Sequence, residues 1–377
     1  MRCEYCVYSE KGDYHNRKHS NNDMSVELAE KAIDMYIDTS DEAPDRVISF
    51  YGGEPLLRIE LIRHCVVYAK KKCLGKKLRF AMTTNGTLLT LETARFLAEN
   101  NFEVLISLDG SKEEHNEYRK FANGEGSFDT IMNNLRAIRN ELPDFFKSIS
   151  FNTVLNPKHN YENIKEYFQN DDIVADAALM HTLVEENDSS SNINFQKEFT
   201  RSREYDHFLL LLHMLDNYSF KSLNKFVKLR KIMILRKNEQ LQTGGYMGKV
   251  NHPSGPCIPG GRRIFVNVKG DIYPCEKVSE NCEQERIGNI VTGLDIEKIN
   301  NLLNIGKLTA EACKNCWAFQ HCNMCCNKSE KDNILCKEAR LSHCRSARNA
   351  AYAELREICI LKEFGCKFGT GNFLDLM

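Results

Sequence analysis

Short apolar runs alternate with amphipathic stretches along the first half of the chain. Four runs rich in β-branched and aromatic residues are predicted as strands, at 46–51, 78–84, 102–107 and 148–155. Apolar residues recur at helical spacing over 25–39, 56–71, 91–99 and 128–140. Strands that alternate with helices of this length form parallel βαβ units. The pattern therefore predicts an α/β barrel or a doubly wound sheet between about residues 25 and 185.

The pattern changes in the second half. The stretch 185–203 is polar and serine-rich, which predicts an insertion or linker, and 205–240 is mostly helical. Within the helical stretch 205–240, residues 221–237 are basic and amphipathic. This pattern favours a solvated helix that bridges two domains over a peptide- or membrane-binding face. Beyond residue 244, short strands and turns alternate with cysteines up to Cys344, and a helix is predicted over 345–358.

Length and composition limit the function classes. A chain of 377 residues fits one large domain and a smaller one. The net charge of −1 argues against a strongly basic nucleic-acid binder. No stretch has the length of a membrane span and no signal peptide is recognisable, so we expect a cytoplasmic protein. In that compartment, sixteen cysteines indicate metal rather than disulfides.

Nine of these cysteines form two arrays. The smaller is the pair Cys3-x2-Cys6, which by itself is equally compatible with a zinc half-site, a redox pair or chance. The larger comprises Cys257, Cys275, Cys313, Cys316, Cys322, Cys326 and Cys344. Soft thiolates in such number favour iron–sulfur clusters, although a zinc ribbon would explain Cys313-x2-Cys316 alone.

Glycine-bearing loops follow three consecutive predicted strands. They are Tyr51-Gly-Gly-Glu-Pro55, Thr83-Thr-Asn-Gly-Thr87 and Ser107-Leu-Asp-Gly110. Loops at the carboxyl ends of parallel strands build the binding sites of α/β folds. Each loop alone would be an ordinary turn, but three in order behind a Cys-x2-Cys pair predict a site for a small polar ligand.

With these motifs the chain resembles the radical S-adenosylmethionine (SAM) superfamily over nearly its whole length. The resemblance implies a partial (β/α)6 barrel, in which Cys3, Tyr5 and Cys6 match the second cysteine, the aromatic residue and the third cysteine of the C-x3-C-x2-C signature. The first cysteine would fall two residues upstream of Met1, so we expect that the true chain begins earlier. Three thiolates would hold a [4Fe–4S] cluster whose fourth iron binds SAM.

The resemblance also implies residues that contact SAM. Tyr5 would lie near the adenine, and Gly52, Gly53 and Glu54 near the methionine amine. Candidates for the carboxylate or the ribose are Ser107, Arg119 and Asn152, which could equally be a strand-end cap, a surface charge and a buried strand amide.

The larger array resembles a SPASM domain, with Arg262-Arg263-x-Phe265-Val-Asn267 and Tyr273-Pro-Cys275 as part of the match. The resemblance implies two auxiliary [4Fe–4S] clusters. One would be held by Cys313, Cys316, Cys322 and Cys344, and the other by Cys257, Cys275, Cys326 and a variable fourth ligand.

The fourth ligand is open to interpretation. Sulfatase-maturating relatives carry a cysteine at the position of Arg263, so an iron could be left for a substrate thiolate unless Cys282 or Cys325 fills it. Those relatives also carry a basic aspartate at the position of Glu276, which we regard as a possible base or as a surface glutamate.

The predicted domains are a radical SAM barrel (1–185), a polar linker with bridging helices (186–250), a SPASM domain (251–350) and a C-terminal helix and tail (351–377). We expect an enzyme that forms thioether cross-links in a cysteine-containing precursor peptide and takes electrons from a flavodoxin or ferredoxin. The alternatives are an anaerobic sulfatase-maturating enzyme and a degenerate, non-catalytic cluster- or peptide-binding protein, which the absent first cysteine would favour.

Overall fold

The computed structural model describes residues 1, 3, 6, 22–183, 196–241, 251–253 and 257–369. The described residues fall into two compact units. The first comprises mainly residues 36–235 with Met1, Cys3 and Cys6, and the second comprises 22–35 and 236–368. The helix α1, Val26–Thr39, runs from the second unit into the first. Among the helices of these described ranges, none combines the length and the apolarity needed to span a bilayer.

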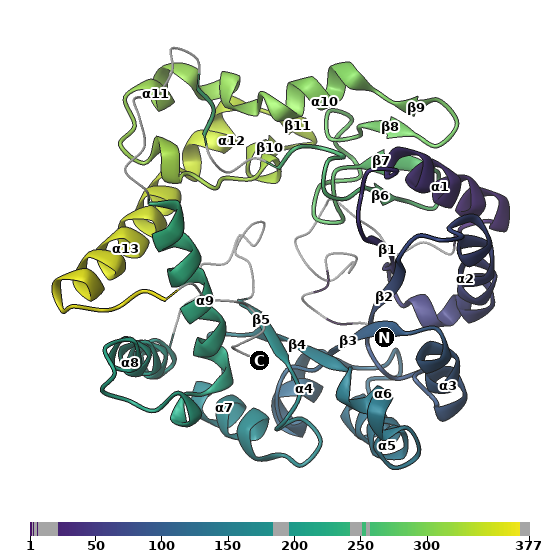
Figure 1. Cartoon of the computed structure of the whole chain (residues 1–377), viewed down its shortest axis with the longest axis horizontal. Helices are drawn as coiled ribbons and strands as arrows, with labels where there is room; N and C mark the ends of the chain where they lie inside the picture. Colours follow the sequence, from purple (N-terminus) through teal and green to yellow (C-terminus); the bar gives the residue numbers. More distant parts are fainter. Residues whose placement is uncertain are drawn as a thin grey trace. The chain divides into compact units, whose positions relative to one another are not determined.

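The first unit is built on a five-stranded parallel sheet. Its strands are β1 (Arg46–Phe50), β2 (Leu78–Thr84), β3 (Phe102–Ser107), β4 (Ser150–Leu155) and β5 (Leu179–Leu183), and each pairs with the next in the order β1-β2-β3-β4-β5. A doubly wound sheet would reverse its strand order, whereas a barrel adds strands in sequence order. Figure 1 shows the strands as one curved row. The predicted barrel-type α/β fold is therefore confirmed.

Helices cover one face of this sheet (Figure 1). They are η1 (Pro55–Arg58), α2 (Ile59–Lys72), α3 (Leu91–Glu99), α4 (Lys112–Tyr118), α5 (Phe128–Glu141), α6 (Pro143–Lys147) and α7 (Tyr161–Asn170). The strand residues that face them are buried, for example Phe80, Val104 and Phe151. Residues of the opposite face, such as Ala81, Ser107 and Asn152, are only half-buried. This second face is the inner surface of the barrel-type sheet.

Two further helices follow, α8 (Lys197–Met214) and α9 (Lys225–Gln240), with the short η2 (Phe220–Ser222) between them. Helix α9 begins in the first unit, and its last residues, from 236, belong to the second. Helix α8 begins inside the stretch 185–203, for which the sequence predicted only a linker. The first turns of α8 bury Phe199, whose ring packs against Tyr161. Helix α9 is basic as predicted, but Phe226 on it packs against aromatic rings of α7 and β5. One side of α9 is thus part of the core.

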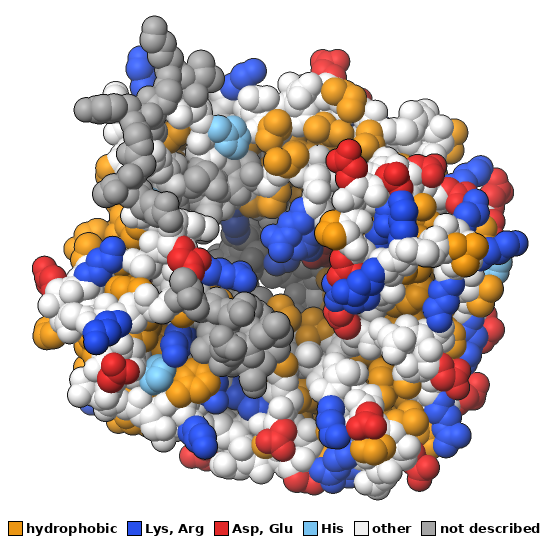
Figure 2. All heavy atoms as spheres, viewed as in Figure 1, with side chains coloured by type: hydrophobic (Ala, Val, Ile, Leu, Met, Phe, Trp, Pro, Cys, Tyr) orange, Lys and Arg blue, Asp and Glu red, His pale blue; other side chains and the backbone are white. Residues whose placement is uncertain are grey.

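The second unit consists of short elements. A four-stranded antiparallel sheet is formed by β6 (Phe265–Val266), β7 (Asp271–Tyr273), β8 (Gly288–Asn289) and β9 (Gly293–Leu294), and β10 (Glu330–Lys331) pairs with β11 (Ile334–Leu335). The helices are α10 (Ile296–Leu303), η3 (Ile305–Thr309), α11 (Ala310–Lys314), η4 (Phe319–His321), η5 (Cys326–Ser329), α12 (Lys337–Ser342) and α13 (Cys344–Glu363). Its apolar cluster centres on Ile272, Ile287 and Leu302. Figure 2 shows basic and acidic side chains interspersed over one face of the molecule, as the net charge of −1 predicts.

Candidate functional site

The N-terminal cysteine pair lies beside a buried ion pair of the first unit. Cys6 donates its backbone N–H to the carbonyl oxygen of Cys3 at 3.3 Å, so the two residues close a turn. Arg119 Nε lies 2.6 Å from Asp109 Oδ2, and both side chains are less than a tenth exposed. Burial raises the pKa of the Cys3 thiol, and the nearby Arg119 partly opposes this shift. Arg119 is therefore no surface charge, and it faces the cysteine that we predicted as a cluster ligand.

A neutral histidine, together with Ser127, links the backbones of Asp109 and Arg119. His115, which is fully buried, accepts the backbone N–H of Asp109 at Nδ1 (3.3 Å). Its Nε2 therefore carries the proton and donates to Ser127 Oγ at 2.9 Å, and the Ser127 hydroxyl donates to the carbonyl oxygen of Arg119. Desolvation lowers the pKa of His115 to about 4. Asp109 Oδ1 also accepts the N–H of Val154, which ties the loop after β3 to β4.

Glu54 joins the loops that follow β1 and β2. Its Oε1 accepts the N–H of Leu56 at 3.1 Å and the hydroxyl of Thr84 at 2.7 Å, and its Oε2 accepts the N–H of Asn85 at 2.8 Å. Desolvation raises the pKa of this carboxyl, and the three donors oppose the shift. Glu54 thus fixes two strand-end loops relative to each other.

The two glycines before Glu54 leave open space. Gly52 has φ +149°, which disfavours any side chain, whereas Gly53 has no such restriction. A Cβ at either position would meet no atom within 4 Å. Open space beside the backbone is in keeping with glycine's use where a ligand approaches closely, and the contact with the methionine amine stays a prediction.

Ser107 and Asn152 lie next to each other on the inner face of the sheet. They are register partners of β3 and β4, and Leu108 donates its N–H to the carbonyl oxygen of Asn152 at 2.9 Å. Both are half-buried, so their polar groups remain accessible from the barrel interior. Tyr5, the predicted adenine contact, lies outside the described residues.

Four cysteines of the second unit line one cavity. Cys313, Cys316, Cys322 and Cys344 contribute to its wall together with apolar side chains and Arg348. Cys344 opens the 20-residue helix α13, where the helix N-terminus favours negative charge. Burial raises the pKa of the Cys344 thiol, and Cys313 adds to the shift. Bound iron would therefore displace thiol protons from this group.

The donor set of this cavity fits a cluster better than one ion. Within the ranges that the structure describes, no three Cys, His, Asp or Glu side chains lie close enough to hold a single metal ion. A cubane cluster holds its thiolates farther apart than one zinc ion does, and four cysteines around one cavity suit it. All sixteen cysteines are described, and none forms a disulfide.

A second group of thiols includes Cys325, one of the two alternatives that the sequence left for the fourth ligand. Cys326 Sγ lies 4.0 Å from Cys325 Sγ, and Cys275 interacts electrostatically with both. Cys257 is exposed. The fully buried carboxyl of Glu285 lies against Cys325 and Cys326, and its Oε1 has no hydrogen-bond partner by geometry. No sequence pattern singles out Glu285, because an isolated glutamate is usually solvated.

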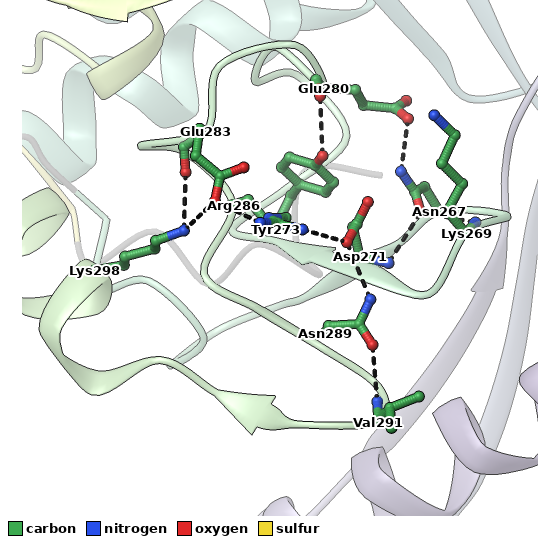
Figure 3. A network of polar contacts seen from close by, with 10 residues as sticks. All are labelled: Asn267, Lys269, Asp271, Tyr273, Glu280, Glu283, Arg286, Asn289, Val291 and Lys298. Carbon is green, nitrogen blue, oxygen red and sulfur yellow. Dashed lines mark hydrogen bonds and ion pairs between the residues drawn. The ribbon is translucent and has the colours of Figure 1, made fainter.

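Polar contacts hold the strand that leads into Cys275 (Figure 3). Asp271 Oδ1 accepts from Arg286 Nη1 and Asn289 Nδ2, each at 3.0 Å. The hydroxyl of Tyr273 donates to the carbonyl oxygen of Glu280 at 3.0 Å. Because Cys275 follows Tyr273 by two residues, these bonds fix its position without help from a large core.

The possible base Glu276 forms an ion pair. Arg263 Nη1 lies 3.2 Å from Glu276 Oε1 and 3.1 Å from Oε2. Arg263 is half-exposed, and the Glu276 side chain is 22% exposed. The two positions that the resemblance assigns to a cysteine ligand and a basic aspartate thus hold an arginine and a glutamate that bind each other.

The chain is similar in sequence to several known proteins. Residues 1–170 match the model of the Radical SAM superfamily. The chain is 26% identical to the cysteine-type anaerobic sulfatase-maturating enzyme of Clostridium novyi over 89% of each chain. It is 39% identical to the serine-type enzyme of Bacteroides thetaiotaomicron, where the match spans only 37% of this chain and 33% of the relative.

The fold also matches a solved structure, native anSMEcpe with bound AdoMet and Kp18Cys peptide, with a TM-score of 0.64. The identity is 22%, and the match covers 96% of each chain. The predicted cofactor class is confirmed, since radical SAM domains use SAM and a [4Fe–4S] cluster. Residues 1–170 therefore form a radical SAM domain, and the chain is similar over 89% of its length to an anaerobic sulfatase-maturating enzyme.

Proposed function

We propose that the enzyme modifies a cysteine-containing, ribosomally made peptide by joining the cysteine sulfur to a carbon atom as a thioether. The observation that carries this proposal is the ion pair of Arg263 with Glu276. The Arg263 guanidinium engages both carboxylate oxygens of Glu276, and an arginine cannot replace a cysteine ligand. Both features separate the chain from formylglycine chemistry, in which the resemblance assigns roles to a cysteine and an aspartate at these positions.

The residues of the first unit would bind and orient the cofactors. Cys3 and Cys6 would hold the SAM cluster, and Gly52, Gly53, Ser107 and Asn152 would line the SAM site with Tyr5. When bound, these groups supply an organic radical that removes a hydrogen atom from the substrate. Arg119 and Asp109 would place a fixed pair of charges beside the cluster, and Glu54 would keep the loops in register.

The thioether step removes two hydrogens from the peptide. One leaves the carbon as a hydrogen atom and reduces the 5′-deoxyadenosyl radical to 5′-deoxyadenosine. The thiol loses the second as a proton and one electron, for which an oxidised iron–sulfur cluster is the proposed acceptor. The electron that cleaves SAM would come from a flavodoxin or ferredoxin. Holding sulfur and carbon side by side would supply the orientation that the step needs.

Two auxiliary [4Fe–4S] clusters are part of this proposal, one on Cys313, Cys316, Cys322 and Cys344 and one at Cys257, Cys275 and Cys326. The cavity that the first four cysteines line supports the former. Residues 1–185 would be the catalytic barrel, 251–350 the SPASM domain, 186–250 the connection and 351–377 the C-terminal helix and tail.

A second candidate is cysteine-type sulfatase maturation. The similarity to the Clostridium novyi enzyme over 89% of both chains favours it. The two candidates predict different products from the same thiol. A thioether keeps the sulfur and loses two hydrogens, whereas formylglycine loses the sulfur and gains an oxygen.

The test is anaerobic reconstitution with iron, sulfide, SAM and a reductant, followed by incubation with peptides encoded beside the gene. We expect 5′-deoxyadenosine and a peptide lighter by two hydrogens, and the Cys→Ser version of the same peptide should stay unmodified. Release of sulfur would establish the second candidate. 5′-Deoxyadenosine formation that never yields the two-hydrogen loss would refute the thioether proposal.

A further inference from the structure

The cluster site at Cys275 and Cys326 needs a fourth ligand, because the corresponding position 263 holds an arginine. Arg263 points its guanidinium at Glu276 and offers no thiolate. Two other cysteines of the second unit, Cys282 and Cys325, are close enough in sequence to compete for this role. The surroundings of the two differ sharply.

Cys282 is excluded by its packing. It is fully buried in the apolar cluster with Ile272 and Ile287. Its thiol is closed off from solvent among apolar side chains with the Glu285 carboxylate as a charged neighbour, and a free cysteine in such a place acts as a small apolar side chain. To reach a cluster, Cys282 would have to leave the centre of the second unit's core.

Cys325 faces the other thiols. Its Sγ lies 4.0 Å from Cys326 Sγ, and Cys275 is near enough to interact with it electrostatically. It is only partly buried and lies at the N-cap position of η5, directly before Cys326.

We propose that Cys325 supplies the fourth protein thiolate of this auxiliary cluster, together with Cys257, Cys275 and Cys326. The chain would thereby have moved one ligand from position 263 to the turn before η5. A cluster with four protein thiolates has no iron left for a substrate sulfur. The peptide thiol would then be positioned by the protein and not by iron, whichever product the enzyme makes.

Glu285 is the competing donor, because its fully buried carboxyl lies against the same two thiols. Its Oε2 already accepts the N–H of Ser279 at 2.9 Å, which leaves Oε1 as the available atom. Thiolates are the ligands that iron–sulfur clusters prefer, so we assign the ligand role to Cys325. The experiment separates the two residues.

The first measurement uses the reconstituted wild-type chain without substitution. Iodoacetamide is added anaerobically to the cluster-loaded and the iron-free protein, and the alkylated cysteines are identified by mass spectrometry. We expect Cys325 to be protected at least tenfold in the loaded protein, as Cys326 is, whereas the exposed Cys359 reacts equally in both. Equal alkylation of Cys325 with and without iron would overturn the proposal.

The second measurement compares variants by iron content and by Mössbauer and electron paramagnetic resonance spectra. Cys325→Ala should lose about four irons per chain or show a changed signal from one cluster, as Cys326→Ala should. Cys359→Ala should match the wild type. Cys325→Ala/Arg263→Cys, which returns a thiolate to the relatives' position, should regain the wild-type iron content. If Glu285→Gln changes the cluster signal and Cys325→Ala does not, the carboxylate is the ligand and the proposal fails.

Discussion

The two units hold their candidate sites in opposite ways. In the first, long strands and helices bury a large core, and buried polar groups such as Asp109, Arg119 and His115 fix the loops at the strand ends. In the second, strands of two or three residues and a small apolar cluster surround groups of cysteines. The sheet of the first unit positions its site without a bound group. The short elements of the second unit would instead depend on bound clusters for part of their folding free energy.

The largest effect that we expect follows from this contrast. Removal of iron by a chelator should unfold much of the second unit and leave the first nearly unchanged, because binding free energy is folding free energy where the core is small. Hydrogen exchange should show lost protection over α10–α13 and retained protection over β1–β5. Equal loss in both units would show that the second unit folds without its clusters.

Breaking the buried ion pair of the first unit should have the next largest effect. Asp109→Asn leaves the Arg119 charge buried and only partly compensated, which should lower the free energy of unfolding by about 3–5 kcal/mol. Asp129→Asn removes a carboxylate from the exposed pair with Lys112 and should cost less than about 1 kcal/mol. Urea unfolding measures both, and similar losses would mean that the Asp109 pair is not desolvated.

His115 should make the first unit sensitive to acid. Its pKa in the folded chain is about 4, below the usual value of 6.5, so the unfolded chain binds the proton more tightly. Stability from this group is complete above about pH 6.5 and is lost as the pH falls toward 4, by at most about 1.4 kcal/mol per pH unit. His115→Gln, which is not charged, should flatten this part of the stability curve. An unchanged curve would assign the acid sensitivity to other groups.

The Glu54 carboxylate should stabilise the first unit more modestly. Glu54→Gln keeps one acceptor oxygen but loses the charge that strengthens three hydrogen bonds, so we expect a loss of about 1–2 kcal/mol. Glu113→Gln, at an exposed glutamate that accepts from Ser111, is the matched control and should leave the free energy of unfolding nearly unchanged. Thermal unfolding of both variants in parallel would check the difference.

The same contrast explains what the sequence could predict. Strands β2 and β3 and helix α3 have the bounds that apolar periodicity indicates, because each element has one strongly buried face. The pairing of Arg263 with Glu276 could not be predicted, nor could the choice between Cys282 and Cys325 as the thiol that lies beside Cys326. Both arise from loops of the second unit, where no periodic pattern reports which side chains meet. Arg119 was recognisable as a candidate but not as buried, since its partner Asp109 is ten residues away.

Variants at the two glycines of the loop after β1 distinguish the effect of filling a ligand site from the effect of backbone strain. Gly53→Ala adds a methyl group that meets no protein atom and requires no unusual φ, so the free energy of unfolding should stay within about 0.5 kcal/mol of the wild type. Gly52→Ala adds an equally unobstructed methyl group, but its φ of +149° is strained for alanine, so this variant should lose stability.

If SAM occupies the space beside the loop, Gly53→Ala should raise the Kd for SAM about tenfold or more, since one misplaced methyl group costs at least about 1.4 kcal/mol in a close contact. Isothermal titration of the cluster-loaded chain measures that Kd. An unchanged Kd with Gly53→Ala would place the methionine amine elsewhere on the inner face of the sheet.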